Sequence, residues 1–140
     1  MTRFLLDTSI VSDAVKPSPS LPLATWMGSQ QDDDLFLSSI TLAEIDRGIR
    51  RLEPSRRRSK LEAWAFGERG LVAAFAGRVL TFDLVAARAW GRFMAEGDRA
   101  GRPRPAIDMQ IAAIAAANDC TVVTRNARHF EGVVPMLDPT

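Results

Sequence analysis

Short apolar runs alternate with longer segments of helical spacing along this 140-residue chain, and no other feature constrains the fold more strongly. Each run has the length and character of a buried β-strand, and the runs lie at 3–6, 35–39, 78–82 and 120–124. Helical spacing is found over 21–31, 42–52, 55–69, 84–99 and 106–118. Strands that alternate with helices are joined by right-handed crossovers. The pattern therefore predicts an α/β fold with a parallel sheet covered by helices on both faces.

The length and composition fit a single domain spanning residues 1–140. Charged residues make up 25% of the chain and hydrophobic residues 46%, which is ordinary for a folded protein and argues against disorder. A last short strand is expected near 133–137. Pro135 lacks a backbone N–H, so this strand should lie at the edge of the sheet.

Cysteine usage and hydropathy indicate the cellular compartment in which the protein is expected to act. The only cysteine, Cys120, cannot form an internal disulfide, which fits a reducing environment. The N-terminal apolar run is short and is interrupted by Asp7, and no stretch approaches the roughly 18 apolar residues of a membrane span. We therefore expect a cytoplasmic protein that does not contact the membrane.

Three acidic residues occupy comparable places next to the predicted strands and helices. Asp7 directly follows the first strand, Glu44 follows the second, and Asp108 lies in the first turn after Pro105. Each has a purely structural interpretation. Asp7 is a good helix cap, and Asp108 complements the positive end of a helix dipole. Glu44 forms a capping box with Thr41, in which each side chain satisfies a free N–H group at the helix start.

Taken together, the three acids favour a metal site. In a parallel sheet, the helices that follow the strands begin at the same edge, so Asp7, Glu44 and Asp108 should converge on one cleft. Clustered carboxylates repel one another unless protons or cations neutralise them. Mg²⁺ or Mn²⁺ prefers such oxygen ligands and can promote in-line displacement at phosphorus. The sequence thus suggests metal-assisted phosphodiester hydrolysis.

Two further polar residues follow the strand predicted at 120–124. Thr124 and Asn126 are placed to hydrogen-bond a water molecule or a carboxylate of the site, although both residue types are also common in plain turns. His129, the only histidine of the chain, is interpreted as a surface or packing residue.

The chain resembles the PIN-domain ribonuclease toxins of bacterial VapBC-type toxin–antitoxin pairs. The segments FLLDTSIVSD, SSITLAEIDRGI, FDLVAARAWG with PAIDMQIAAIAAAND, and VVTRNARHF are similar to successive motifs of that family, in the same order. The resemblance implies a three-layer α/β/α sandwich with a central, mostly parallel sheet. It also implies RNA cleavage that depends on Mg²⁺ or Mn²⁺, homodimerisation, and inhibition by a cognate antitoxin protein.

The resemblance assigns roles to individual residues. Asp7, Glu44 and Asp108 match three acidic metal-site residues of the family, with Thr124 and Asn126 assisting them. Asn126 replaces a fourth acid and cannot supply charge, so the number of bound metals, one or two, stays open. His129 stands where many members of the family have an Asp, and its role stays open as well.

The basic residues are unevenly distributed, although the net charge is only +1. Residues 47–60 carry seven basic side chains and one acid, Glu53. A basic run is usually a solvated helix face, but for a ribonuclease it can also contact phosphates or a protein partner. The arginines that we expect to contact RNA or the antitoxin are Arg56, Arg57, Arg58, Arg102, Arg104 and Arg125, with Arg99 next to the second group.

Two alternative functions remain open at this stage. The chain could be a PIN-like binding module with weak catalysis, whose acidic pocket docks a basic segment of a partner. More distantly, it could be a receiver-like phosphoacceptor built on Asp7, because such domains also gather acids at strand ends. A requirement for divalent metal separates the nuclease from the binding module, and labelling by acetyl phosphate identifies the phosphoacceptor.

Overall fold

A five-stranded parallel sheet forms the centre of the protein. The computed structural model describes residues 2–140, so Met1 of the expected domain lies outside the described residues. The strand order is β3-β2-β1-β4-β5, and all four strand pairs are parallel. The strands are β1 (Phe4–Leu6), β2 (Leu35–Ser38), β3 (Val79–Leu80), β4 (Thr121–Val123) and β5 (Met136–Leu137).

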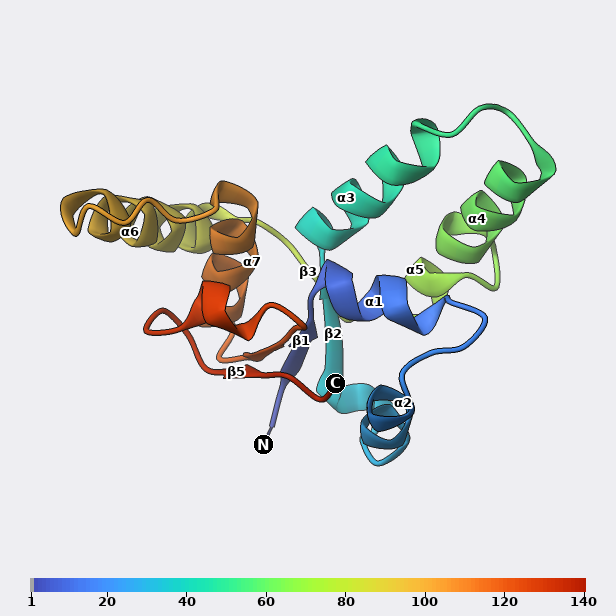
Figure 1. The fold of residues 1–140 in the computed structure, drawn as a ribbon, viewed down its shortest axis with the longest axis horizontal. Helices are drawn as coiled ribbons and strands as arrows, with labels where there is room; N and C mark the ends of the chain where they lie inside the picture. The colour runs from blue at the N-terminus through green and yellow to red at the C-terminus, as the bar shows by residue number, and fades with distance from the viewer. Residues whose placement is uncertain (1) are drawn as a thin grey trace.

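Helices cover both faces of this sheet (Figure 1). The α-helices are α1 (Thr8–Ala14), α2 (Leu21–Gly28), α3 (Ser39–Arg50), α4 (Arg56–Phe66), α5 (Leu71–Ala74), α6 (Leu84–Arg99) and α7 (Ala106–Ala117). Two 3₁₀ helices, η1 (Asp32–Asp34) and η2 (Ala127–Phe130), complete the described elements. Helices α6 and α7 lie on one side of the sheet, and α1, α2, α4 and α5 lie on the other (Figure 1). The expected α/β/α arrangement is thereby confirmed.

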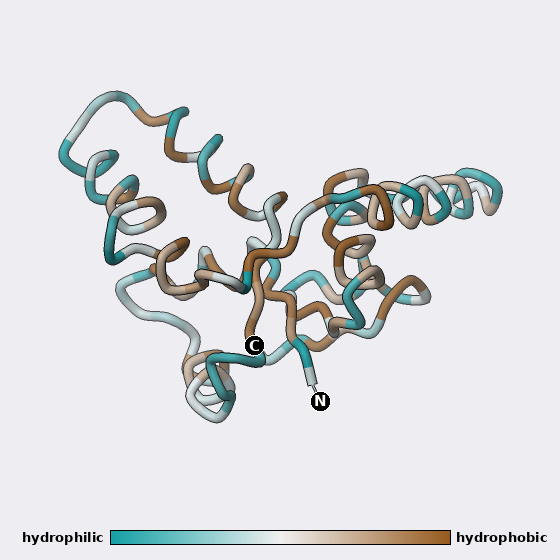
Figure 2. The backbone as a smooth tube through the Cα atoms, turned by 180° about the vertical axis from the view of Figure 1, so that it is seen from behind, coloured by the Kyte–Doolittle hydropathy of each residue, from teal (hydrophilic) through white to brown (hydrophobic). Residues whose placement is uncertain are grey.

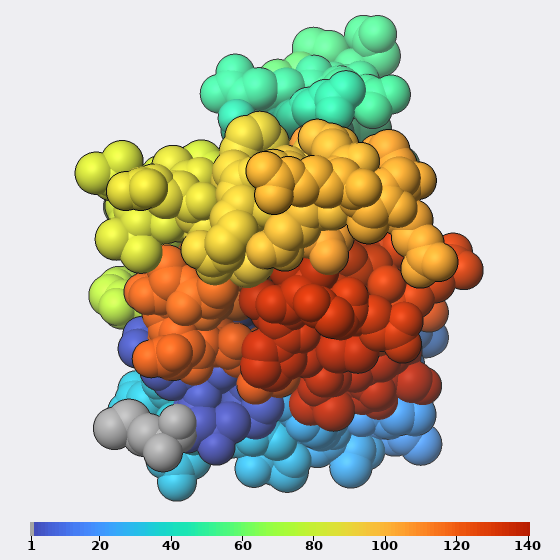
Figure 3. All heavy atoms as spheres, turned by 90° about the vertical axis from the view of Figure 1, so that its left-hand side faces the viewer, coloured from blue at the N-terminus to red at the C-terminus, as the bar shows by residue number. Residues whose placement is uncertain are grey.

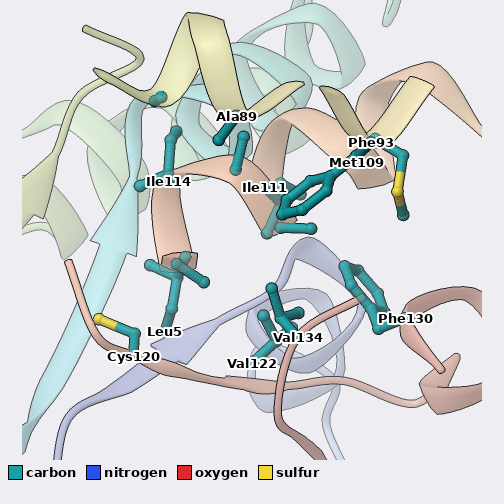
Figure 4. Packing of buried hydrophobic residues seen from close by; sticks show 14 residues of the cluster. Leu5, Ala89, Phe93, Met109, Ile111, Ile114, Cys120, Val122, Phe130 and Val134 are labelled. Carbon is teal, nitrogen blue, oxygen red and sulfur yellow. The ribbon is translucent and has the colours of Figure 1, made fainter. Parts of the chain in front are cut away.

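Consecutive strand residues supply the two halves of the core. Leu5 packs with α6 and α7, whereas Leu6 packs on the opposite face with α1, and both are at most 2% exposed. Val122 and Val123 divide in the same way. Because a sheet covered on both faces leaves neither face of its central strands in water, the runs are continuously apolar rather than alternating. Figure 4 shows the α6–α7 half, where Phe93 and Met109 lie above the sheet.

The α3–α4 pair extends away from the sheet and shapes the molecule's outline. In the space-filling view it protrudes beyond the band formed by α6 and the segment that follows it (Figure 3). The backbone is hydrophobic along the central strands and more hydrophilic around the turn between α3 and α4 (Figure 2). Within residues 2–140, no helix is both long and apolar enough to span a bilayer.

The order of the strands contains one reversal, and it lies at β1. The chain runs outward from β1 through β2 to β3, then returns through α6 and α7 to β4 on the other side of β1. Ligand sites of open parallel sheets form outside the carboxyl ends of the strands at such a reversal. Asp7 directly follows β1 and Thr124 directly follows β4, so both residues stand at this point.

Helix α3 begins without any loop after β2, which rules out the capping-box interpretation of Glu44 and the expectation that Thr41 caps the helix. Ser38, the last residue of β2, is the N-cap of α3, and its hydroxyl accepts a hydrogen bond of 3.0 Å from the Thr41 N–H. Thr41 is therefore inside the helix and is not the cap. Glu44 lies in the second turn, beyond the reach of a capping box with Ser38. The prediction failed because two adjacent serines precede Thr41, and propensity alone does not choose among three good cap residues.

Other sequence-based boundaries differ more modestly. The strand expected near 133–137 is β5, which pairs with β4 at the sheet edge as predicted. Helix α1 did not appear in the periodicity because it has only seven residues, although its cap, Asp7, was recognised as one. The helix expected over 55–69 ends at Phe66, and the short α5 follows it.

Replacing Ser38 tests which residue starts α3. Ser38→Ala should lower the free energy of unfolding by about 1 kcal/mol, because the Thr41 N–H loses its acceptor at a buried helix start. Urea denaturation measures the change. Ser59→Ala, at an exposed position within α4, is the matched control and should be nearly neutral. Equal effects of the two substitutions would contradict the assignment of Ser38 as the cap.

Candidate active site

Asp7 is the most constrained acid of the protein. Its side chain is only 4% exposed, and its Oδ1 accepts a hydrogen bond of 2.9 Å from the Ser9 N–H at the start of α1. Its Oδ2 accepts a hydrogen bond from the hydroxyl of Thr124, which is fully buried. The backbone N–H of Asp7 donates to the Val123 carbonyl at 2.9 Å. The ends of β1 and β4 thus hold this carboxylate from two sides.

Burial raises the pKa of Asp7 above its usual range, because the charged form loses contact with water. The hydrogen bonds from Thr124 and Ser9 lower the pKa, and the negative charge of Asp108 raises it again. Asp108, in the first turn of α7, thus influences Asp7 electrostatically. The convergence of all three acids on one cleft stays a prediction.

Glu44 points toward α1 and does not fold back on its own helix. Its Oε1 accepts a hydrogen bond of 2.5 Å from the Thr8 hydroxyl, and the oxygens of Thr8 and Thr41 lie 3.2 Å apart. Thr8 immediately follows Asp7. The acids of α3 and β1 are therefore linked through one threonine. Sequence reasoning missed Thr8, although its place beside Asp7 in the DTS motif was a usable signal.

Asp108 has a direct side-chain partner, His129, whose role the sequence analysis left open. Its Oδ2 lies 2.8 Å from Nδ1 of His129 in η2. The two side chains are 24% and 35% exposed, so the pair stands at the rim of the site. His129 is partly exposed, as expected of a surface residue, and it also contacts one of the three acids. The sequence feature that could have drawn attention to His129 is that many members of the family that this chain resembles have an Asp at that position.

Thr124 and Asn126 occupy the turn after β4 as expected, but they differ in their contacts. The Thr124 hydroxyl donates to Asp7 and accepts from the Asn126 N–H at 2.9 Å. The Asn126 side chain is exposed and does not cap η2. Thr124 is therefore fixed within the site, whereas Asn126 contributes its backbone and leaves its amide group facing solvent.

The donor set fits a hard divalent cation by its chemistry. Glu44 Oε2 and Asp108 Oδ1 receive no hydrogen bond from residues 2–140, and carboxylate oxygens are what Mg²⁺ and Mn²⁺ prefer. In the described part of the chain, no group of three or more His, Cys, Asp and Glu side chains is already arranged to hold a metal ion. The acids share one edge of the sheet without forming a closed ligand cage.

The arginines expected to contact RNA or a partner fall into two groups. Arg58 donates to the Leu52 carbonyl, Arg104 to the Phe93 carbonyl, and Arg125 to Asp13 at 2.9 Å. These three arginines make contacts within the protein. The remaining three are exposed and are Arg56, Arg57 and Arg102.

Asp13 holds Arg125 beside the site, and the sequence analysis did not single it out. Asp13 is 3% exposed; it also accepts a hydrogen bond from the Ser20 N–H and forms an ion pair with Lys16. The Ser20 N–H and these cations lower the pKa of Asp13. Because the Arg125 N–H also donates to Ser9 Oγ, the turn after β4 is tied to α1.

Two hollows, one on each side of Glu44, are each lined by an arginine. One, of about 280 Å³, is lined by Glu44, Thr8 and Arg57 among others, between α1, α3 and α4. The second, of about 160 Å³, is lined by Glu44, Arg47 and Gln110, between α3 and α7. A wider hollow of about 560 Å³ between α3 and α4 is lined by none of the three acids. Neither hollow beside Glu44 is lined by Asp7 or Asp108, so of the three acids these hollows give access to Glu44 alone.

Comparison with known proteins gives consistent matches over almost the whole chain. The family model of the PIN domain matches residues 4–133. The VapC ribonuclease Y4jK of Sinorhizobium fredii is 35% identical over 127 residues, which cover 91% of this chain and 89% of that protein. The crystal structure of FitAcB from Neisseria gonorrhoeae has a TM-score of 0.88 and 31% identity, covering 97% of each chain. That of DNA-bound VapBC from Salmonella typhimurium has a TM-score of 0.76 and 29% identity, covering 100% of each.

The raised pKa of Asp7 predicts a specific dependence of stability on pH. The folded state holds the Asp7 proton more tightly than the unfolded chain, so ionisation costs stability as pH rises from the ordinary value of 3.8 through the raised one. Asp7→Asn cannot ionise. In EDTA its stability should therefore increase relative to wild type from about pH 4 upward and keep that gain once wild-type Asp7 is ionised.

Urea denaturation of both proteins across this pH interval measures the effect. Asp33→Asn removes an exposed acid of η1 and controls for the change of net charge. A stability difference between Asp7→Asn and wild type that is independent of pH would show that burial does not perturb Asp7.

Proposed function

Because the chain belongs to the PIN-domain family and is a ribonuclease toxin of the VapC type, we propose that Asp7, Glu44 and Asp108 hold Mg²⁺ or Mn²⁺ for RNA hydrolysis. Thr124 and Asn126 assist them from the turn after β4. One observation carries this proposal. The buried carboxylate of Asp7 lies at the strand-order reversal, under the influence of the Asp108 charge, although no described cation stands beside it.

The positions of these acids indicate how the chain's own residues serve the reaction. Bound Mg²⁺ or Mn²⁺ would supply a water of lowered pKa and screen the charge that develops on the scissile phosphate. Thr124 fixes the orientation of Asp7, and Thr8 fixes that of Glu44, so both carboxylates keep their direction before RNA arrives. The exposed amide of Asn126 can hydrogen-bond a phosphate or water at the mouth of the site.

The partners follow from the family. One similar structure is of VapBC bound to DNA, and we infer that the present chain is likewise inhibited by a cognate antitoxin protein. We also infer that it forms a homodimer and acts in the cytoplasm, where its RNA substrate is found. Arrest of growth on expression, relieved by the antitoxin, is the corresponding cellular activity.

A binding module is the second candidate, and the open arrangement of the acids favours it. Because the described acids are not gathered into a ligand cage, the same pocket could dock an arginine or lysine of a partner without cleaving RNA. The two candidates differ in one requirement. A nuclease loses its activity in EDTA, whereas ionic docking does not need a divalent metal.

Glu44→Gln separates a metal ligand from a structural residue. Thr8 can donate to the amide oxygen of Gln as it does to Glu44, so the fold should be retained. The neutral amide cannot hold the cation in the same way, and RNA cleavage in limiting Mg²⁺ should fall by at least about a hundredfold, since even the loss of a ligand's supporting partner costs about 10–100-fold. The rate of cleavage by purified protein is the measurement.

Glu62→Gln is the matched control, because Glu62 is an exposed acid of α4 that pairs only with Arg58. It should cleave RNA at the wild-type rate. Wild-type activity in Glu44→Gln would refute the ligand role, and cleavage by wild type in excess EDTA would refute metal dependence altogether.

The two groups of arginines predict different phenotypes. Arg57→Gln should weaken RNA binding and reduce the slope of log affinity against log salt by roughly 0.7, the value for one phosphate contact on a single strand. Arg104→Gln should instead lower the melting temperature, because Arg104 donates to the Phe93 carbonyl within α6 and so ties the segment after the helix to it. Fluorescence anisotropy at several salt concentrations and thermal melts measure the two effects. An unchanged salt slope in Arg57→Gln would show that Arg57 does not contact RNA and belongs to a solvated helix face.

A further inference from the structure

We propose that His129 is a positioning residue for Asp108. The His129 ring holds one oxygen of the Asp108 carboxylate so that the other oxygen faces the site. The proposal rests on the proposed function, because it concerns the carboxylate that is offered to the metal there. It assigns a role to the only histidine of the chain.

The contact between the two residues is short and comes from well-anchored elements. Nδ1 of His129 lies 2.8 Å from Oδ2 of Asp108. The next residue, Phe130, is fully buried in the core beneath α6 and α7, as Figure 4 shows. The backbone N–H of His129 donates to the Asn126 carbonyl at 2.9 Å. The backbone at His129 is therefore anchored, which limits how far the ring can follow Asp108.

The chemistry of the pair defines the direction of the hydrogen bond. A carboxylate oxygen only accepts, so Nδ1 carries the hydrogen and donates it to Oδ2 of Asp108. Oδ1 of Asp108 keeps its lone pairs for another donor or a cation. The His129 ring thereby restricts Asp108 to binding through one oxygen, as residues that hydrogen-bond to metal ligands commonly do.

A restraint on Asp108 is needed because of its neighbours. The Asp7 carboxylate is buried, and the charges of Asp7 and Asp108 repel each other, which favours rotation of the Asp108 side chain toward water. Asp108 lies in the first turn of α7 and is 24% exposed, which gives it room to rotate away. The hydrogen bond from His129 opposes that rotation. A purely structural role at the helix start would be satisfied by any direction of the carboxylate.

Metal binding by three variants tests the proposal without relying on catalysis. Titration of Mn²⁺ followed by electron paramagnetic resonance should show about 10–100-fold weaker binding for His129→Leu than for wild type. His129→Asn should recover most of the affinity, because its amide N–H₂ can reach the position of Nδ1. Arg128→Gln, at the exposed neighbouring position of η2, is the matched control and should bind as wild type does.

A double-mutant cycle in EDTA tests the hydrogen bond itself. If His129 contacts Asp108 in solution, the changes in melting temperature of Asp108→Ala and His129→Leu should not add, since each substitution removes the same interaction. Additive changes would overturn the proposal whatever the metal data show. The cycle also reveals whether His129→Leu simply damages the fold.

The remaining outcomes separate this proposal from the metal site as a whole. If Asp108→Asn weakens Mn²⁺ binding but His129→Leu does not, the metal site stands and the positioning role is overturned. If Asp108→Asn binds Mn²⁺ as tightly as wild type, or wild type does not bind it, the proposed metal site fails and this proposal fails with it. Weaker binding in His129→Leu, recovery in His129→Asn and non-additive melting together establish the role.

Discussion

The pairing of β1 with β4 is the contact on which the rest of the structure depends. These strands are far apart in sequence, and their registry places Leu6 opposite Val123. Asp7 and Thr124, the residues that directly follow the two strands, are therefore also adjacent, and the Thr124 hydroxyl donates a hydrogen bond to the Asp7 carboxylate. No local propensity could bring these two groups together. The site exists because the chain, after forming α6 and α7 on one face of the sheet, returns to the sheet as β4 beside β1.

Burial and charge act against each other at this edge of the sheet. Hydroxyl and amide donors stabilise the Asp7 carboxylate, yet its surroundings still disfavour the charged form. Each remaining acid has its own hydrogen-bond donor, Thr8 for Glu44 and His129 for Asp108. The fold thus tolerates nearby negative charges by giving each a separate partner instead of linking them to one another.

The fold class and the acids were predictable from the sequence because they depend on simple patterns. Apolar runs located all five strands, and the parallel sheet implied that Asp7 and Asp108 approach each other. The role of Glu44 was less accessible, since Ser38, Ser39 and Thr41 are all good caps and only the observed helix start distinguishes them. The His129 contact was not predictable from spacing. It depends on the way η2 folds over α7, which is decided by the burial of Phe130.

The direct junction of β2 and α3 restricts how this protein can change in evolution. Ser38 is both the last residue of the strand and the cap of the helix, so no spacer can absorb a change of length. Inserting one residue there would turn every later position of α3 by about 100° around the helix axis and direct Glu44 away from Thr8. The turn at 51–55, which joins α3 to α4, lies beyond Glu44 and carries no such restriction. Insertions and deletions among relatives should therefore collect in that turn, whereas the distance from the strand to Glu44 stays constant.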